Sequence, residues 1–161
     1  DYTGEVKYGE TVNKSYFPKE NNHIFSNNDK SIIDFLTEFS SNQEQTYIRG
    51  FLGRMLFSKE DVFKKLSVLS GGERVRTLIA KMMLEESNTF IIDEPTNHLD
   101  MESIQSLNKG LINFNGVILF SSTDHELVQS TANRVIEIFE DGTYIDQPMT
   151  YDEYLETKEN K

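Results

Sequence analysis

The sequence lacks three features that mark large classes of protein. It has no cysteine, which excludes a disulfide framework and thiolate metal sites and fits a reducing compartment such as the cytoplasm. Its longest apolar runs, such as residues 117–120, are about four residues long, whereas a membrane-spanning helix needs about 20. It contains no G-x-x-x-x-G-K-[ST] pattern, the loop that cradles phosphates in many nucleotide-binding proteins. We therefore expect a cytoplasmic chain without a membrane span, a signal peptide or a phosphate-binding loop of its own.

Positive charge is also scarce. The chain has 16 Lys and Arg against 27 Asp and Glu, which gives a net charge of −11. A chain this acidic is repelled by nucleic-acid backbones over most of its surface, so we expect no direct nucleic-acid binding from it alone. The stretch from Arg49 to Lys81 is the exception, because it carries eight basic and three acidic residues. We interpret it as an ordinary solvated face, and whether it faces RNA in a longer protein stays open.

Predicted helices and strands alternate from residue 70 onward. Residues 88–92 and 117–120 read as short apolar strands, which are typical of buried parallel sheets. Helices predicted at 71–85 and 101–113 each carry one apolar face that can pack on such a sheet. The remaining predicted elements are strands at 134–139 and 143–145 and a helix at 151–156. With 161 residues, enough for one domain with a core, the sequence predicts an α/β fold with a mostly parallel sheet.

The first 69 residues have a different pattern. Residues 5–17 alternate polar and β-favouring residues, which predicts short strands before a turn at Pro18, and residues 21–28 are interpreted as a loop. Three helices are then predicted, beginning at Ser31, after Asn42 and at Ser58. The sequence therefore divides into a β-rich core segment at 1–30, a helical subdomain at 31–69 and the second half of the core at 70–161.

The first motif with chemical meaning is Leu69-Ser70-Gly71-Gly72-Glu73. Ser70 and Glu73 have the spacing of a capping box at the start of a helix. The two glycines leave backbone N–H groups uncovered there, and a helix N-terminus with free donors and positive partial charge favours a bound phosphate. Taken alone, the motif is more simply explained as a helix cap with a glycine turn.

The second motif is the string TFIIDEPTNHLD at residues 89–100, an apolar strand followed by two adjacent carboxylates and a proline. Carboxylates at the C-terminal end of a parallel strand lie where open α/β sheets bind ligands. Consecutive strand residues point in opposite directions, so Asp93 and Glu94 can have different roles. One could hold Mg²⁺, usually through its water shell, and the other could orient or deprotonate a water molecule. An ordinary strand-end turn does not account for the whole string.

Together the two motifs resemble those of the ABC ATPases. The form DEPTNHLD resembles the ABC-F subfamily in particular, whose members carry two ATPase domains in one chain and in many cases act on the ribosome. Three further strings are similar to the second ATPase domain of such proteins, namely Tyr16-Phe17-Pro18-Lys19, Arg49-Gly50-Phe51-Leu52 and Tyr151-Asp152-Glu153-Tyr154-Leu155. The resemblance covers essentially the whole chain, which it implies is a partial P-loop NTPase domain.

The resemblance implies a role for each motif residue. Ser70, Gly71 and Gly72, with Glu73 beside them, would contact the γ-phosphate of an ATP held by a second ABC domain. Asp93 would hold Mg²⁺ through water as the Walker B aspartate, and Glu94 would be the catalytic base. The D-loop, which crosses the interface between the domains, would be Asn97, His98, Leu99 and Asp100. Asp100 also suits the N-cap of the next helix. The implied cofactors are ATP and Mg²⁺, and the implied partners are a second ABC domain in the same parent chain and the ribosome.

The sequence departs from the family's pattern at three places. The phosphate-binding loop, with its strand and helix, is expected upstream of Asp1, so the chain would be the C-terminal part of a second ATP-binding domain and inactive by itself. Lys19 stands at the Q-loop position, where Gln is usual, and cannot ligate Mg²⁺ while protonated. Thr123 stands at the switch-histidine position and carries no charge. His125 is expected to be an exposed helix residue, and whether it or Lys19 supplies the missing charge stays open.

Two other functions fit parts of the sequence. The chain could belong to the ATPase subunit of a membrane transporter, which shares the core motifs but binds transmembrane partners at its Q-loop cleft. It could also be an inert interaction module, since the loop that supplies most of the phosphate affinity is missing. The sequence upstream of Asp1 distinguishes these alternatives, because a second ABC cassette there would indicate the F subfamily.

Overall fold

The computed structural model describes residues 3–18, 20–55, 57–97 and 99–159. The chain forms two compact units, Asp1–Ser121 and Ser122–Lys161, and each is described by itself. Lys19 and His98, both singled out from the sequence, lie outside the described residues. No helix in the described ranges is long and apolar enough to cross a membrane.

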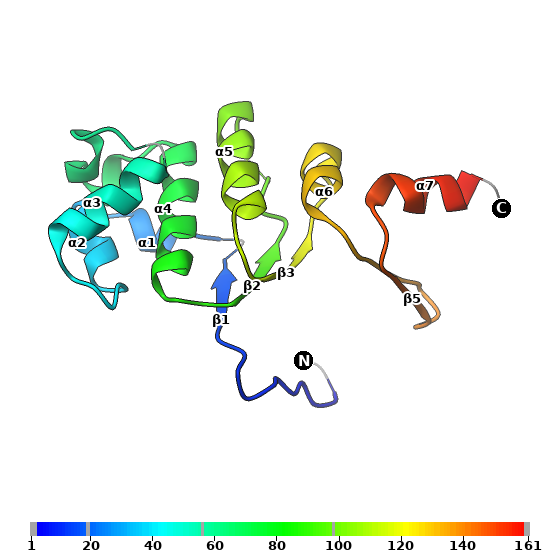
Figure 1. The fold of residues 1–161 in the computed structure, drawn as a ribbon. Coiled ribbons are helices and arrows are strands. Elements are labelled where there is room, and N and C mark those ends of the chain that lie inside the picture. Colours follow the sequence, from blue (N-terminus) through cyan, green and yellow to red (C-terminus); the bar gives the residue numbers. More distant parts are fainter. Residues whose placement is uncertain (1–2, 19, 56, 98, 160–161) are drawn as a thin grey trace. The chain divides into compact units, whose positions relative to one another are not determined.

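The first unit is built on a three-stranded parallel sheet in the order β1-β2-β3. Its strands are β1 (Lys14–Phe17), β2 (Thr89–Asp93) and β3 (Val117–Ser121). Helix α4 (Gly71–Leu84) precedes β2, and helix α5 (Met101–Ile112) connects β2 to β3. Both helices lie on the same face of the sheet (Figure 1), as right-handed crossovers between parallel strands require. The predicted α/β fold with a parallel sheet is therefore confirmed.

The core lies between this sheet and the two helices. Phe17 of β1 and Phe90 and Ile92 of β2 are at most 2% exposed, in alternation with less buried neighbours. Phe90 stacks on Phe114, with ring centroids 3.7 Å apart. Each such side chain, fully buried, stabilises the fold by about 1.5–3 kcal/mol. The residues of α4 that are buried are Gly72, Val75, Thr77, Leu78, Ile79, Ala80, Met82 and Leu84.

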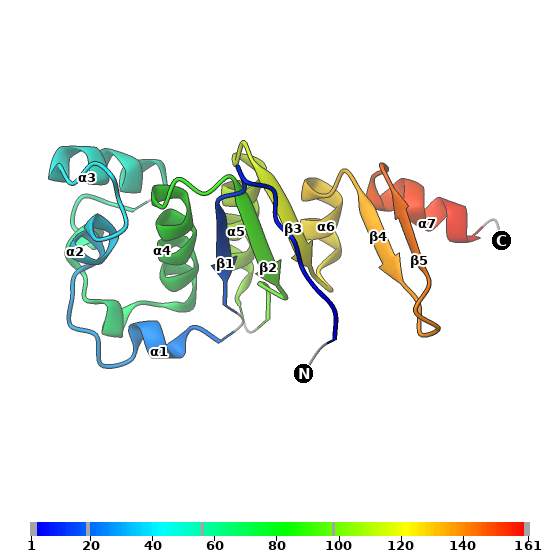
Figure 2. The same ribbon diagram turned by 90° about the horizontal axis from the view of Figure 1, so that it is seen from below.

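The opposite face of the sheet is apolar but exposed. Tyr16 of β1 is 55% exposed, and Val117 and Leu119 of β3 are 64% and 54% exposed. These residues alternate along their strands with residues that are more buried. Within the described residues of the first unit, no helix covers this face (Figures 1 and 2). One side of the sheet therefore lacks the cover that α4 and α5 give to the other side.

The helical region precedes α4 and contains three α-helices and two 3₁₀ turns. They are α1 (Asn22–Phe25), α2 (Ile32–Thr37), α3 (Gln45–Arg54), η1 (Asp61–Phe63) and η2 (Leu66–Val68). The helix predicted to begin at Ser31 is confirmed, because Ser31 Oγ accepts a hydrogen bond from the Asp34 amide. The helix predicted after Asn42 corresponds to α3.

Three predictions for the first 69 residues are wrong. Residues 21–28 are more than a loop, because Phe25, fully buried, anchors the single helical turn of α1. The helix predicted at Ser58 has the expected cap but forms only the 3₁₀ turn η1, which ends where Lys64 adopts an extended conformation. The strands predicted at 5–17 reduce to β1, because only residues 14–17 lie beside β2 and find a pairing partner.

The second unit consists of helix α6 (His125–Thr131), an antiparallel hairpin and helix α7 (Tyr151–Glu159). The hairpin strands are β4 (Val135–Ile138) and β5 (Tyr144–Gln147). Arg134 Nε and Nη2 donate to the two carboxylate oxygens of Asp146 at 2.6 and 2.7 Å. Gly142 has φ +83°, a left-handed conformation that favours glycine, and it lies in the turn between the two strands. The two strands and the final helix predicted for this part of the chain are therefore confirmed.

Candidate functional site

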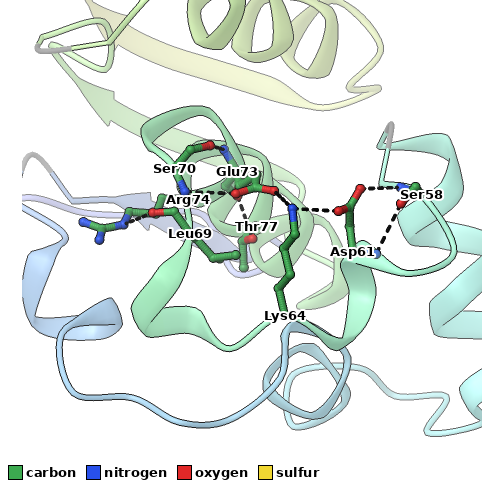
Figure 3. A network of polar contacts seen from close by, with 8 residues as sticks. All are labelled: Ser58, Asp61, Lys64, Leu69, Ser70, Glu73, Arg74 and Thr77. Atoms are coloured by element: carbon green, nitrogen blue, oxygen red, sulfur yellow. Dashed lines mark hydrogen bonds and ion pairs between the residues drawn. The ribbon is translucent and has the colours of Figure 1, made fainter.

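The start of α4 is closed by the capping box that the sequence predicts. Ser70 Oγ accepts a hydrogen bond from the Glu73 amide at 3.3 Å, and Glu73 Oε2 accepts one from the Ser70 amide at 2.9 Å (Figure 3). Two of the backbone donors that a helix start leaves unpaired are thereby satisfied. The remaining donors of the first turn can still face an anion.

Lys64 ties this cap to the helical region. Its Nζ lies 2.7 Å from Glu73 Oε1 and 2.7 Å from Asp61 Oδ1, and Asp61 Oδ2 also accepts a hydrogen bond from the Ser58 amide (Figure 3). Hydrogen bonds from Lys64 and then Ser58 lower the pKa of Asp61 to about 2. Hydrogen bonds to Asp61 and then Glu73 raise the pKa of Lys64. The ammonium thus balances carboxylates from two segments.

Glu73 is ionised despite its surroundings. Burial is the largest single influence on it and favours the neutral acid, but hydrogen bonds from Lys64 and the Ser70 amide together outweigh burial, so its pKa lies below its usual value. The charge on Glu73 is therefore held in place and largely compensated by Lys64. Sequence reasoning missed Lys64, because the contact joins residues nine apart across the η2 turn.

A second set of contacts fixes the backbone before the helix. Arg74 Nε donates to the Leu69 carbonyl at 3.0 Å, and its Nη1 donates to Asn22 Oδ1 at 3.2 Å. Thr77 Oγ1 donates to the Glu73 carbonyl at 2.7 Å (Figure 3). The signature segment is therefore held from the helix itself, from α1 and from the loop that contains Lys64.

The two glycines of the signature have different surroundings. A Cβ atom built on Gly71 would have no neighbour within 4 Å, so space is open there. A Cβ atom built on Gly72 would lie 2.6 Å from Ser103 Oγ, too close for any real contact. Gly71 therefore leaves room for an approaching ligand, whereas Gly72 allows α4 to pack against the start of α5.

Asp100 is the N-cap of α5, as predicted. Its Oδ1 accepts hydrogen bonds from the Ser103 amide at 2.8 Å and from Ser103 Oγ at 2.6 Å. These bonds lower its pKa, and the positive charge of Arg76 adds a weaker contribution. Because Ser103 also lies against Gly72, the signature and the last D-loop residue meet through one side chain. Before the cap, the Leu99 amide donates to the Thr96 carbonyl at 3.1 Å, and Asn97 is exposed.

The two carboxylates stand at the end of β2. Asp93 Oδ1 accepts a hydrogen bond from Ser121 Oγ at 2.7 Å, and the Glu94 amide donates to the Ser121 carbonyl at 3.1 Å. Asp93 pairs with Ser121 across the sheet, on the face where Val117 and Leu119 are exposed. Glu94 has φ +43°, a conformation that costs a non-glycine residue energy and is common at functional sites.

Ser121 is a site residue that sequence reasoning did not single out. Its role depends on the register between β2 and β3, which places Ser121 opposite Asp93. The signal was present in the sequence, since aligning the ends of the two apolar strands pairs these residues. Strand register is rarely fixed by sequence alone, because a shift of one residue moves every side chain to the other face.

The donor set at the end of β2 fits a magnesium ion. The described residues contain no group of three or more His, Asp or Glu side chains able to enclose a metal. Mg²⁺ usually keeps several waters and takes one or two carboxylates together with substrate phosphates, so it needs no such group. The hydrogen bond from Ser121 engages one oxygen of Asp93 and orients the carboxylate. Asp93 is therefore the residue suited to hold the ion.

Thr123 and His125 belong to the second unit, whereas Asp93 and Glu94 belong to the first. Thr123 is exposed and precedes Asp124, whose Oδ1 caps α6 by accepting from the Leu127 amide at 2.8 Å. His125 is the first residue of α6 and is exposed, as predicted. Its Nε2 lies 3.8 Å from Asp152 Oδ1, and its ring contacts Tyr151 edge-on.

Comparison with known proteins places these motifs in a family context. Residues 4–97 match the family model described as ABC transporter. The chain is 52% identical over 155 residues to the "Uncharacterized ABC transporter ATP-binding protein YkpA" of Bacillus subtilis, covering 96% of the chain and 28% of that protein. It is 35% identical to "ABC transporter F family member 5" of Arabidopsis thaliana, covering 95% of the chain and 22% of that protein.

A solved structure resembles the fold. It is the complex of the archaeal ribosomal stalk protein aP1 with the archaeal ribosome recycling factor aABCE1, with a TM-score of 0.69 and 17% sequence identity over 98% of the chain and 31% of the solved chain. At this identity the likeness concerns the fold alone. In every one of these comparisons the chain spans less than a third of the length of its relative.

Proposed function

We propose that this chain, which belongs to the ABC transporter family of ATP-binding domains, supplies the signature and the Walker B carboxylates of an ATP-hydrolysing domain in a longer protein of the ABC-F type. Membership of the family confirms the resemblance that LSGGE and DEPTNHLD indicate. The relative named as an F family member supports the subfamily over the ATPase subunit of a membrane transporter. Because the chain spans only 28% and 22% of these relatives, the activity of the whole protein is inferred from one part of it.

The observation that carries the proposal is the placement of Asp93. Its carboxylate lies at the carboxyl end of a parallel strand and accepts a hydrogen bond from Ser121 on the next strand. This edge is where open α/β sheets bind their ligands. Asp93 also shares the sheet face that carries the exposed side chains of Val117 and Leu119. A phosphate-binding strand and helix that cover this face would meet the carboxylate directly.

The roles of the two carboxylates follow from their positions. Mg-ATP, when bound, supplies the γ-phosphoryl group that is transferred to water. Asp93 would hold the metal through its water shell, with Ser121 fixing the orientation of the carboxylate. Glu94 leaves the strand with a left-handed backbone and would orient the attacking water and accept its proton.

The start of α4 would serve the ATP of the opposite domain. A helix N-terminus attracts phosphate through its unpaired N–H groups, and Gly71 leaves the approach open. Lys64 compensates the charge of Glu73, so the cap does not present a free carboxylate to the incoming phosphate. Ser70, Gly71 and Gly72 would form this contact, and residues 97–100 would cross the interface as the D-loop.

The exposed apolar face of the sheet supports the proposal that this chain is only part of an ATP-binding domain. Tyr16, Val117 and Leu119 would be buried by a phosphate-binding strand and helix supplied from elsewhere in the parent chain. The loop that joins such a strand to its helix supplies most of the phosphate affinity in this class of protein. We therefore propose that the isolated chain neither binds Mg-ATP tightly nor hydrolyses it. The division into regions 1–30, 31–69 and 70–161 belongs to the same proposal.

The partners and the location of the parent protein are also proposed. A second ABC domain in the parent chain would hold the ATP that meets the signature, and the parent would act in the cytoplasm on the ribosome. The support is the F family name of one relative, together with the resemblance of DEPTNHLD to the ABC-F subfamily, many of whose members act on the ribosome. Lys19 and Thr123 stand where Gln and His are usual, which would make the two ATP sites unequal.

The test is the Glu94→Gln variant of the full-length protein. Loss of a general base lowers the rate by about 100- to 10,000-fold, so ATP hydrolysis at this site should fall by that factor while ATP binding is kept. The other domain's Walker B glutamate is replaced in all samples, so that only this site is measured. Glu102→Gln is the matched control, since Glu102 is an exposed residue in the first turn of α5.

Two results would contradict the proposal. Wild-type turnover in Glu94→Gln would remove Glu94 from the role of base, and an equal loss in Glu102→Gln would attribute the effect to local charge. The isolated chain is measured alongside. Its hydrolysis of ATP would contradict the proposal that the missing phosphate-binding loop is required.

A further inference from the structure

A cavity of about 460 Å³ lies between α3, α4 and α5 in the first unit. Its size falls within the range of small-molecule pockets, about 300–1,000 Å³. None of its lining residues belongs to the signature, the D-loop or the end of β2, so it is a different site from the proposed phosphate contacts. The residues that line it are Phe51, Met55, Arg76, Met83, Ser106, Lys109, Gly110 and Asn113.

The helices present continuous faces to this cavity. The lining residues of α5 and of its C-cap are spaced by three, one and three positions, which places them on one side of the helix. Arg76 and Met83 are two turns apart on α4 and therefore lie on one side of that helix. The close approach of the helices depends on Gly110, where a Cβ atom would lie 3.2 Å from Ile79 Cγ2. The cavity is therefore formed by ordered helices.

The cavity carries positive charge that the described residues balance only in part, since Arg76 acts only weakly on Asp100 and its guanidinium lies 5.2 Å from the centroid of the Phe57 ring. Arg76 Nε is buried and has no hydrogen-bond partner in the described part of the chain. The only hydrogen bond recorded there for its guanidinium is a long one, 3.4 Å from Nη1 to Ser106 Oγ. Lys109 forms no ion pair within the described ranges. A buried charged donor without a partner is costly to keep, and an anion would satisfy it.

Apart from Ser106 and Asn113, the rest of the wall is apolar and adaptable. Phe51 contributes a ring, and Met55 and Met83 contribute thioethers, which adjust to irregular ligands. A bare inorganic anion would leave this wall without contacts. A neutral apolar molecule would leave Arg76 Nε unpaired. The combination therefore fits a ligand that has one anionic group and an apolar body.

We propose that this cavity binds a small organic anion, a carboxylate or a phosphate ester attached to an aromatic or aliphatic group. Arg76 and Lys109 bind the anionic end, and Phe51, Met55 and Met83 contact the apolar end. The ligand bridges α4 and α5, the helices that begin at the signature and at Asp100. The site is separate from the proposed ATP chemistry and does not depend on it.

The methionine methyl groups allow a direct test. The chain has five methionines, and two of them, Met55 and Met83, line the cavity. The full-length protein, labelled with ¹³C at the methionine methyls and free of nucleotide, is titrated with benzoate, phenyl phosphate or neutral benzamide. Both anions should shift the Met55 and Met83 signals saturably, with a dissociation constant of about 1 mM for ligands this small. The exposed Met101, and Met149, which belongs to the other unit, should not respond, because neither lines the cavity.

The three ligands answer different questions. The anion that binds more tightly assigns the natural group as a carboxylate or a phosphate. Benzamide has the same ring without the charge, so it should bind at least about tenfold more weakly, which is the usual effect of one hydrogen bond to a charged group. Equal binding of benzamide and benzoate would overturn the proposal, as would the absence of any saturable shift.

Matched variants locate the charge. Lys109→Gln should weaken benzoate binding about tenfold, and Arg76→Gln should do the same if the variant folds. Lys59→Gln removes a lysine of the same charge from an exposed loop outside the cavity and should leave binding unchanged. If Lys109→Gln binds benzoate as the wild type does, the cavity does not recognise the anion and the proposal is wrong. Because nucleotide is absent, this result is independent of whether the protein hydrolyses ATP.

Discussion

The start of α4 and the end of β2 carry the two parts of the proposed chemistry, and they are held in different ways. The backbone before α4 is fixed by side chains from separate segments, including Lys64, Arg74 and the cap of Ser70 and Glu73. The end of β2 is joined to the next strand through Ser121, and Glu94 adopts a left-handed conformation there. The start of α4 is held by many side-chain contacts, whereas the end of β2 holds Glu94 in an unfavourable backbone conformation.

This difference matches the tasks proposed for the two regions. A surface that must receive a phosphate from another domain benefits from donors fixed in advance, because no energy is then spent on ordering them. A catalytic carboxylate must instead be placed at one point relative to water, and backbone strain persists where the surroundings determine the geometry. The two glycines of the signature also differ in their surroundings, since Gly71 faces open space and Gly72 faces Ser103.

The largest effect on folding is expected from Gly72→Ala. The new methyl group would lie 2.6 Å from Ser103 Oγ, and overpacking of this kind costs about 1–3 kcal/mol, of which the helix preference of alanine over glycine offsets about 1 kcal/mol. Amide exchange of α4 and α5 in the full-length protein should therefore become faster by up to about 30-fold, as measured by hydrogen–deuterium exchange mass spectrometry.

Gly71→Ala is the matched control, because its methyl group meets nothing and alanine favours the helix. Exchange should be unchanged or slower in this variant. Ser103→Ala should relieve part of the Gly72→Ala effect, although it also removes a hydrogen bond to Asp100. Equal exchange in Gly71→Ala and Gly72→Ala would show that the two glycines do not differ as described.

Thr123→His should have the next largest effect. Loss of one charged or strongly polarised donor at a transition state costs about 100- to 1,000-fold, and threonine recovers part of that. We therefore expect turnover at the Glu94 site to rise about tenfold in the full-length protein, with the other site silenced.

The companion variant Lys19→Ala gives the control. If Thr123→His leaves the rate unchanged and Lys19→Ala abolishes it, Lys19 already supplies the charge. If neither variant changes the rate, His125 supplies the charge or domain opening limits turnover. Either result would contradict the prediction that threonine at position 123 slows hydrolysis at this site.

The smallest effect is expected on thermal stability when the pH is lowered. Asp61 has a pKa of about 2 instead of its usual 3.8, because Lys64 and then Ser58 donate hydrogen bonds to it. A carboxylate whose pKa falls on folding contributes stability above the unfolded value and loses that contribution as the pH drops toward the folded value. Between pH 3.8 and about 2, Tm should therefore fall less steeply for Asp61→Asn than for wild type. Parallel Tm curves from calorimetry would mean that the contacts of Asp61 do not stabilise the fold.

Many contacts at the start of α4 and α5 could be predicted from the sequence, because they join residues that are close in the chain. The capping box joins residues three apart, and the Asp100 cap does the same. The contact of Lys64 with Glu73 could not be predicted, because it depends on how the η2 turn directs the chain. The clash at Gly72 depends on the packing of α4 against α5, a tertiary property that leaves no pattern in the sequence.

The end of β2 was predictable in a different sense. The string DEPTNHLD locates Asp93 and Glu94 without any geometry, whereas Ser121 needed the register of β3. Two of the three errors lie where elements are one turn long. The anchoring of α1 by Phe25 and the shortening of the helix at Ser58 to η1 are decided by tertiary packing, since isolated short helices are marginal in water.

The central claim is that the start of α4 is a phosphate contact for the opposite ATP as well as a helix cap. It is tested by the ATP-dependent approach of the two ABC domains in full-length Glu94→Gln, measured as a distance between spin labels on the two domains. Glu94→Gln alone should close when ATP is added. Adding Gly71→Asp places a negative charge in the open space at the helix start, so the distance should stay at its nucleotide-free value. If the double variant closes on ATP as fully as Glu94→Gln, residues 70–72 are a helix cap and nothing more.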